Sequence, residues 1–308
     1  MRISTSATWS NALSNLMRAQ ERQNTANDRV STQKNATDLM GYGRSSEIIA
    51  AYQSSLARTE SFIRINKTVT ERLNSQDLAL TTTGDAAASA KESVMNALAG
   101  NTGAGLMESL QGNFSLALQG LNFQHNGQYL FGGGRDTDAP VTAGSLSQLA
   151  AAPDAASVFV NGDVKKTSRI DANTALETGF LASEVGEKLM QVFRDIKAYN
   201  DDPLTGPFGT ELTDAQKAFL TQKAAEFGAA HDDLLEHTSL NGTLQKRVEN
   251  SQDSLQSQAN ALTKLIGDRT DADMAKAYTE LQQAQVSVQA SAQVLADLRS
   301  SSLLNLLS

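Results

Sequence analysis

The sequence predicts a mainly α fold, a long antiparallel helical bundle or coiled coil formed by both chain halves, with a small β-containing insert between them. Apolar residues recur every seven positions over long stretches of the second half, which is typical of helices packed side by side. Only 5% of the 308 residues are aromatic and four are proline, a composition that favours extended helices over one thick core.

The first half of the chain predicts three helices. The first spans about 1–35. The residues of its expected contact seam follow one another at alternating spacings of four and three: Trp9, Leu13, Leu16, Gln20, Gln23, Asn27 and Val30. Because half of that seam is polar, this helix is expected to be marginal alone. A break follows at 41–43, and then a long helix to about 98 and a third over 105–124.

The middle of the chain predicts a β-hairpin over 157–167. Its strands flank Asn161-Gly162, the residue pair that a type I′ turn prefers because both residues tolerate a positive φ. Helical periodicity returns at Phe180 and lasts to Ile196, and a loop with two prolines follows.

The second half carries the strongest pattern. Steps of seven predict a long helix through Leu220, Phe227, Leu234, Asn241, Val248, Leu255 and Leu262. Asn241-Gly242 is expected to kink or break it, because glycine costs about 1 kcal/mol in a helix interior. Asp271 or Asp273 is expected to cap a last helix, in which Met274, Leu281, Val288 and Leu295 step by seven with Tyr278, Gln285 and Ala292 as companions.

These elements predict a nested domain order. Residues 1–42 and 269–308 form a terminal coiled-coil domain for assembly, 43–136 and 178–268 a helical rod domain, and 137–177 a small β-containing outer insert. The polar-rich helices at the two ends gain little from each other alone. We therefore expect them to pack against neighbouring subunits.

The glycine-rich stretch Gly132–Arg135 raises the question of a phosphate site. A phosphate loop follows a strand and opens a helix, whereas here a helix precedes and no helical period follows. A strand turning through glycines out of the bundle is the preferred interpretation. His125, His231 and His237 lack further ligands at metal spacing, and no hydrolase motif is present. The sequence thus predicts no enzyme, no catalytic residue, no cofactor and no metal.

The charge distribution limits the partners. The net charge is −8, and the scattered Lys and Arg residues form no basic stripe, so nucleic acid is not expected. No apolar run reaches the roughly 20 residues that span a bilayer, and no cleavable secretory signal opens the chain. The absence of cysteine fits the cytoplasm and equally a protein exported without disulfides.

Three segments resemble a known family. Residues 271–307, "DADMAKAYTELQQAQVSVQASAQVLADLRSSSLLNLL", resemble the end of bacterial flagellins. The opening "MRISTS" and the stretch "GQYLFGGG" resemble the hook-associated, hook–filament junction branch of that family. Residues 31–51 keep Ser31-Thr32 and Lys34 of the family pattern but lack its glycine, proline and paired aspartates.

The resemblance implies a structural axial protein of the bacterial flagellum that joins hook and filament by helical self-assembly. It implies contacts with copies of itself in a ring, a hook-associated protein on the hook side, flagellin on the filament side and an export chaperone. It also implies an extracellular location reached through the flagellar type III channel. The expected subunit-interface residues are Leu13, Leu16, Val30, Leu281, Val288, Leu295, Leu303, Leu304 and Leu307. Alternatives are a flagellin, a secreted helical effector or adhesin, and a phosphate-ligand enzyme built around Gly132–Arg135.

Overall fold

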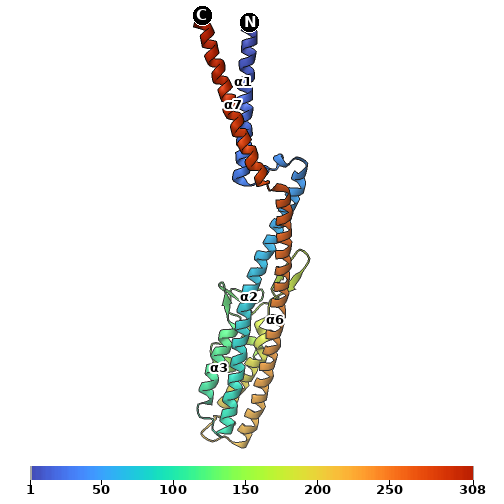
Figure 1. The fold of residues 1–308 in the computed structure, drawn as a ribbon. Helices are drawn as coiled ribbons and strands as arrows, with labels where there is room; N and C mark the ends of the chain where they lie inside the picture. The colour runs from blue at the N-terminus through green and yellow to red at the C-terminus, as the bar shows by residue number, and fades with distance from the viewer. Residues whose placement is uncertain (1, 308) are drawn as a thin grey trace. The chain divides into compact units, whose positions relative to one another are not determined.

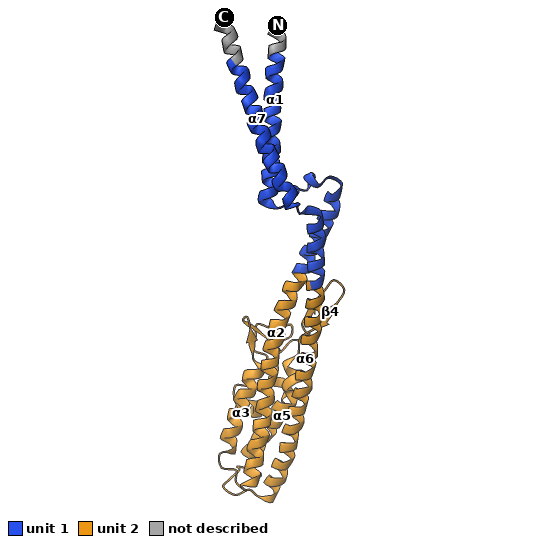
Figure 2. Cartoon of the chain, in the orientation of Figure 1, with its two compact units in different colours: residues 1–60, 257–308 blue, residues 61–256 orange. Residues whose placement is uncertain are grey.

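The computed structural model describes residues 2–307, with side chains described from residue 6 to residue 300. Six helices of 16 or more residues account for most of the described chain (Figure 1): α1 Arg2–Thr32, α2 Ser46–Ala99, α3 Leu106–Leu121, α5 Ala182–Asp201, α6 Asp214–Thr270 and α7 Met274–Leu307. The mainly α prediction is confirmed. The chain divides into two compact units, 1–60 with 257–308 and 61–256 (Figure 2).

The unit 61–256 is a helical bundle in which α2 and α6 run antiparallel. Side-chain contacts fix their pairing: Asn66 Nδ2 donates to Ser251 Oγ at 3.2 Å, and Asn241 Nδ2 donates to the Leu73 carbonyl at 3.0 Å. Helices α3 and α5 complete the bundle (Figure 2). The predicted pairing of long helices from the two chain halves is therefore present within this unit.

Aromatic rings fill the middle of the bundle. Phe193 of α5 lies 1% exposed, with its ring centroid 5.6 Å from that of Phe114 and 5.0 Å from that of Phe227, both edge to face. Edge-to-face packing is the arrangement that the charge distribution of aromatic rings favours. Aliphatic side chains surround the rings, among them Leu73, Leu80, Val94, Leu110, Leu121, Leu189, Ile196, Leu220, Leu234 and Val248.

Helix α6 is continuous over 57 residues, so the break expected at Asn241-Gly242 is wrong. Asn241 lies fully buried and its amide donates to the Leu73 carbonyl of α2. Packing against α2 thus outweighs the low helix propensity of a single glycine, because most helical stability in proteins comes from tertiary contacts. The predicted seven-residue steps from Leu220 to Leu262 are all buried.

The hairpin expected over 157–167 is also wrong. Ala156–Val158 is a short 3-10 helix, η2, and the Asn161-Gly162 pair makes tertiary contacts instead of a turn. Asn161 Nδ2 donates to Ser183 Oγ at 3.1 Å, and the Gly162 N–H donates to the Gly132 carbonyl at 2.9 Å. These contacts hold the segment against α5.

Two small hairpins occur elsewhere. β1 Gln124–His125 pairs with β2 Gln128–Tyr129 through Asn126-Gly127, whose φ angles of 52° and 78° are those of a type I′ turn. β3 Thr167–Arg169 pairs with β4 Ala175–Glu177. The small β content is thus confirmed, but its strands lie on both sides of the predicted position.

The segment 137–177, predicted as an outer insert, also contains the short helix α4 Leu146–Ala151, which Ser145 caps through its side chain. Apolar residues of this segment are buried in the same core as the long helices: Val141, Leu146, Leu149, Val158, Ile170 and Leu176. Part of it therefore belongs to the packed interior of the unit 61–256.

The other unit, 1–60 with 257–308, contains the antiparallel pair α1 and α7 (Figure 1). Asp273 caps α7 by accepting from the Lys276 N–H at 3.1 Å, which confirms a predicted cap. Asp271, the other predicted cap, instead accepts from Lys34 Nζ at 2.5 Å. The 3-10 helix η1 Met40–Ser45 lies where the break at 41–43 is expected, and Gly43 there has a φ of 54°.

Candidate assembly surface

Helices α1 and α7, together called the terminal pair below, meet along small side chains. Among the residues of the pair whose side chains the structure describes, the buried ones are alanines spaced by seven, Ala12, Ala19 and Ala26 on α1 and Ala277 and Ala284 on α7. We call these five residues the alanine seam. Larger side chains between them are half-buried: Leu16, Gln23 and Val30 on α1, and Leu281, Val288 and Leu295 on α7. Small residues at the contact let two helix backbones approach closely.

The alanine seam differs from the predicted seam at most of its positions. Of the predicted positions, Leu16, Gln23 and Val30 lie along it, whereas Trp9, Leu13, Gln20 and Asn27 are exposed. On α7 the companions of the seven-residue steps are Ala277 and Ala284, and the predicted Tyr278 and Gln285 are exposed. The sequence signal that could have found the seam is the alanine repeat at 12, 19 and 26.

The predicted interface residues therefore fall into three groups. Leu13 is 51% exposed on the surface of the terminal pair. Leu16, Val30, Leu281, Val288 and Leu295 are half-buried between α1 and α7. Leu303, Leu304 and Leu307 lie outside the residues whose side chains the structure describes.

Large apolar side chains lie exposed on the outside of the terminal pair. Trp9, Leu13 and Met17 follow one another at spacings of four on α1, and Tyr278, Val286 and Val294 lie on α7 at spacings of eight. Residues four apart on a helix are neighbours on its surface, so the first three form one apolar stripe. Apolar side chains grouped in this way mark interaction sites more often than isolated ones do.

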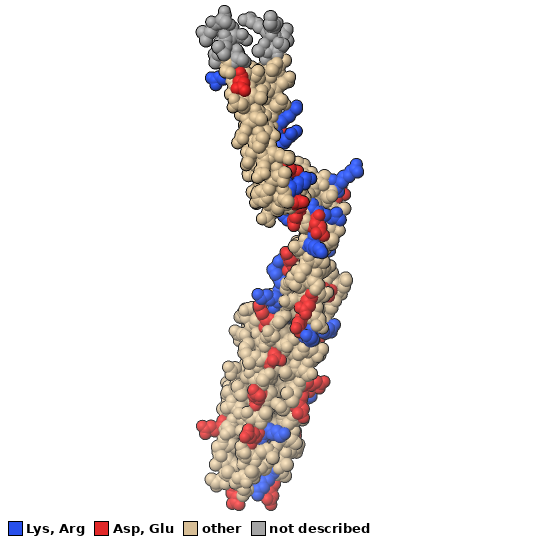
Figure 3. All heavy atoms as spheres, in the orientation of Figure 1, with Lys and Arg blue, Asp and Glu red and all other residues tan. Residues whose placement is uncertain are grey.

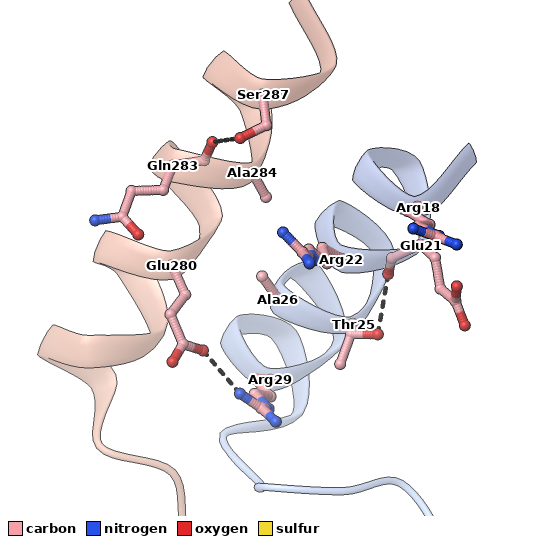
Figure 4. A pocket seen from close by; sticks show the side chains of 10 residues that line it. All are labelled: Arg18, Glu21, Arg22, Thr25, Ala26, Arg29, Glu280, Gln283, Ala284 and Ser287. Carbon is pink, nitrogen blue, oxygen red and sulfur yellow. Dashed lines mark hydrogen bonds and ion pairs between the residues drawn. The ribbon is translucent and has the colours of Figure 1, made fainter. Parts of the chain in front are cut away.

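A groove of about 570 Å³ runs along one side of the terminal pair (Figure 4). Small side chains line part of it, Thr25, Ala26, Ala284 and Ser287 among them, and Arg18 and Arg22 line it as cations. In Figure 4 the Arg22 side chain reaches toward α7, whereas Glu21 points away from it.

The ion pairs of the groove leave it with excess positive charge. Arg29 Nη1 lies 2.7 Å from Glu280 Oε2, so the carboxylate that α7 contributes is already paired. Among the described residues, neither Arg18 nor Arg22 has an ion pair. The groove thus presents two unpaired guanidinium groups.

The connection between α1 and α2 is tied to the α6–α7 junction. The Asn35 N–H donates to the Thr270 carbonyl at 2.7 Å, and the Ala272 N–H donates to the Gln33 carbonyl at 2.9 Å. The Lys34 ammonium donates to Asp271, and this hydrogen bond lowers the pKa of the Asp271 carboxyl below its ordinary value. These contacts hold the connection between α1 and α2 against the α6–α7 junction.

The glycine-rich stretch is a turn in which two of the four backbone N–H groups donate to carbonyls of the same chain. The Gly132 N–H donates to the Tyr129 carbonyl and the Arg135 N–H to the Gly132 carbonyl, at 3.5 and 3.0 Å. Gly133 has a φ of 60°, and a Cβ there would lie 2.5 Å from the Gly162 carbonyl oxygen. Arg135 pairs with Asp138 at 3.5 Å. The glycines therefore allow close packing of the chain, and no helix begins directly after the stretch as one does after a phosphate loop, since α4 begins only at Leu146.

The histidines serve local contacts. His231 Nδ1 lies 3.0 Å from the Gly84 carbonyl, His125 Nδ1 lies 2.9 Å from Ser75 Oγ, and His237 stacks edge to face on Phe180. Over the described part of the chain, no group of three potential metal ligands comes together.

Charged side chains are spread over the face seen in Figure 3, with Lys and Arg interspersed among Asp and Glu. A partly buried basic group lies in the unit 61–256, where burial lowers the pKa of Arg72 although Asp136 lies nearby. None of the helices, over the range that the structure describes, carries an apolar stretch that could cross a bilayer.

The fold and these surfaces define a class of protein: a mainly α chain whose two ends pair as helices and carry exposed apolar side chains. Comparison with known proteins makes the class more specific. Residues 224–307 match the family described as the bacterial flagellin C-terminal helical region. No curated protein matches the sequence.

Two solved structures share the fold. A protein from Vibrio parahaemolyticus described as a flagellar hook-associated protein is 13% identical, with a TM-score of 0.60 over 73% of this chain and 97% of that chain. FlgL of Bacillus cereus is 15% identical, with a TM-score of 0.54 over 69% of this chain and 96% of that chain. The flagellin-like segment and this fold together support a structural protein of the flagellum.

Proposed function

We propose that this chain is the hook–filament junction protein, hook-associated protein 3, a structural axial protein that joins hook to filament by helical self-assembly. The flagellin-like segment 224–307 and the fold shared with flagellar hook-associated proteins support a place in the flagellum. The opening "MRISTS" and the stretch "GQYLFGGG" favour the junction branch over the filament subunit.

The observation that carries the assembly part of the proposal is the apolar exposure of the terminal pair. Trp9, Leu13 and Met17 on α1 and Tyr278 on α7 are 42–62% exposed. Large apolar side chains grouped on helices gain free energy when a neighbour covers them, about 25 cal/mol for each Å² of apolar surface removed from water. A second copy of the chain supplies equivalent helices for that purpose.

The mechanism follows from the symmetry of such contacts. Where one surface of a subunit binds a different surface of the next, the rotation between them closes a ring or continues as a helix. We propose that Leu13 lies in this inter-subunit contact, and that Leu16, Val30, Leu281, Val288 and Leu295 support it by holding α1 against α7. Leu303, Leu304 and Leu307 remain proposed interface residues.

The proposed role determines the partners and the location. Copies of the chain form a ring, with a hook-associated protein on the hook side and flagellin on the filament side. The chain reaches the outside of the cell through the flagellar type III channel, and an export chaperone holds it before export. No catalytic activity, cofactor or metal is part of this role.

A flagellin is the second candidate, and the match of 224–307 to the flagellin C-terminal region favours it specifically. The two roles predict different positions on the flagellum. Antibody labelling of isolated flagella should mark the distal end of the hook for a junction protein, whereas labelling along the filament would establish a flagellin.

The test of the assembly surface is Leu13→Asp in cells that lack the wild-type chain. A carboxylate at a contact that excludes water is costly to desolvate, so we expect hooks without filaments. Leu235→Asp on α6 is the matched control, since Leu235 is 54% exposed against 51% for Leu13. Normal filaments with Leu13→Asp, at normal export of the chain, would contradict the proposal.

A further inference from the structure

The groove of the terminal pair combines small lining residues with unpaired cations. Arg18 and Arg22 are four residues apart on α1 and therefore neighbours on its surface. Glu280, the carboxylate of α7 at the groove, already pairs with Arg29 at 2.7 Å. Figure 4 shows Arg22 reaching toward α7, whereas Arg18 and Glu21 lie on the side of α1 that is turned away from it. Glu21 also lines the groove, so three arginines face two carboxylates there. The groove therefore keeps a net positive charge that favours carboxylates.

The same unit carries matching charges at the junction of α6 and α7. Residues 268–273, which we call the acidic corner, contain three aspartates, all exposed. Asp271 pairs with Lys34 of its own chain at 2.5 Å. Among the described residues, Asp268 and Asp273 have no ion pair, although one oxygen of Asp273 caps α7. Arg269, between them in sequence, lies over the Tyr52 ring at 5.7 Å.

We propose that the groove of one copy receives the acidic corner of the next copy, with Arg18 and Arg22 facing Asp268 and Asp273. This inference rests on the proposed function, because it names the partner surface used in self-assembly. The groove and the corner are different surfaces of one chain, so the contact is head to tail and repeats from subunit to subunit. The small side chains of the groove leave room for the corner to approach.

The charges give this contact direction and specificity. Opposite charges arranged across an interface favour one pairing and disfavour others, because like charges brought together repel. The exposed apolar stripe of α1 supplies attraction without such selectivity, since the hydrophobic effect is non-directional. Exposed charges are screened by salt, so the contact should weaken as ionic strength rises.

Charge reversal on each side tests the pairing in the purified full chain. The groove variant carries Arg18→Glu and Arg22→Glu. The corner variant carries Asp268→Lys and Asp273→Asn, because asparagine retains the cap of α7. Self-association is measured by sedimentation velocity at low and high salt. We expect each variant to need about tenfold more protein than wild type to associate at low salt.

The decisive variant combines all four substitutions, which again places opposite charges across the contact, negative in the groove and positive at position 268. Association should return toward the wild-type concentration dependence if these surfaces meet. The matched control is Arg58→Glu with Arg64→Glu, two exposed arginines of α2 whose reversal changes the net charge equally. Circular dichroism verifies that every variant keeps its helix content.

The outcomes separate this inference from the proposed function. Wild-type association that is lost with Leu13→Asp but unchanged in the groove variant would overturn the groove contact alone. An equal loss in the arginine control, or no recovery in the combined variant, would also overturn it. A wild-type chain that does not associate at any concentration, alone or on isolated hooks, would instead refute the proposed function.

Discussion

Replacing Phe193 by alanine should cost more stability than a change on the surface of the bundle. Phe193 is 1% exposed, and its ring meets Phe114 and Phe227 edge to face. A buried Phe→Ala change costs about 3–5 kcal/mol, including the cavity that remains. The change also removes two edge-to-face ring contacts, worth about 0.5–1.5 kcal/mol each. We therefore expect the free energy of unfolding to fall by about 4 kcal/mol.

Urea denaturation followed by far-ultraviolet circular dichroism measures this loss. With a slope of about 2–3 kcal/mol per M, a loss of about 4 kcal/mol lowers the midpoint by roughly 1.3–2 M. Phe193→Leu, which keeps most of the burial but no ring contact, should lower the free energy of unfolding by about 1–2 kcal/mol. Met95→Ala, at a side chain 50% exposed on α2, should change it by less than about 0.5 kcal/mol.

The comparison refutes the reasoning if Phe193→Ala and Met95→Ala shift the midpoint equally. That result would mean that the three rings do not form the centre of a cooperative bundle. A smaller slope in Phe193→Ala alone would indicate a partly unfolded state, and the midpoint would then not measure the loss.

Three further predictions concern close packing, the terminal pair and pH. Gly120→Val should destabilise the bundle by about 1–3 kcal/mol in the same assay, because a Cβ at Gly120 would collide with Thr83 and lie 2.8 Å from the Ala79 carbonyl oxygen. Ala19→Leu should force α1 away from α7 and accelerate amide hydrogen exchange in both helices, whereas unchanged exchange would show that the alanine seam is not tightly packed. Asp271 has a lowered pKa in the folded chain, chiefly through its hydrogen bond from Lys34, so its small stabilising contribution is present above the ordinary aspartate pKa and lost as pH falls through the folded value. A carboxyl NMR titration should show that Lys34→Met returns the pKa of Asp271 toward the ordinary range, and no change would exclude this pairing in solution.

The long helices were predictable because their apolar repeats are long. Seven-residue steps from Leu220 to Leu262 bury every named position, and the repeat survives Asn241-Gly242 because α2 packs against it. Local propensity alone could not reveal that support. A low propensity at one residue is a weaker signal than a repeat sustained over many turns.

The hairpins show where local signals are ambiguous. Asn-Gly occurs at 126–127 and at 161–162, and both pairs suit a type I′ turn. The second has the more strand-like neighbours, yet the first forms the turn. Contacts of Asn161 with Ser183 and of Gly162 with Gly132 decide between them, and neither contact is visible in sequence order.

The candidate site was predictable only in part. That both ends take part in assembly stays a prediction, but the sequence placed Leu16 and Val30 on α1 and Leu281 on α7 at positions that are half-buried between the two helices. The sequence analysis chose Tyr278 and Gln285 as the companion positions on α7, whereas the buried residues are their neighbours Ala277 and Ala284. A shift of one position leaves the seven-residue spacing unchanged, so spacing alone does not distinguish the two sets. The groove with Arg18 and Arg22 depends on two helices that are far apart in sequence, so it required the fold.

The alanine seam has a consequence for the lifetime of the chain ends. An alanine in place of leucine buries about three fewer carbon atoms, or roughly 2 kcal/mol less burial free energy per position. Elements with few buried contacts open most often, and opened segments are cut by proteases first. The free subunit should therefore lose parts of α1 and α7 to trypsin before the bundle is attacked, while assembled copies resist. Protease susceptibility would thus report the proposed assembly without any label.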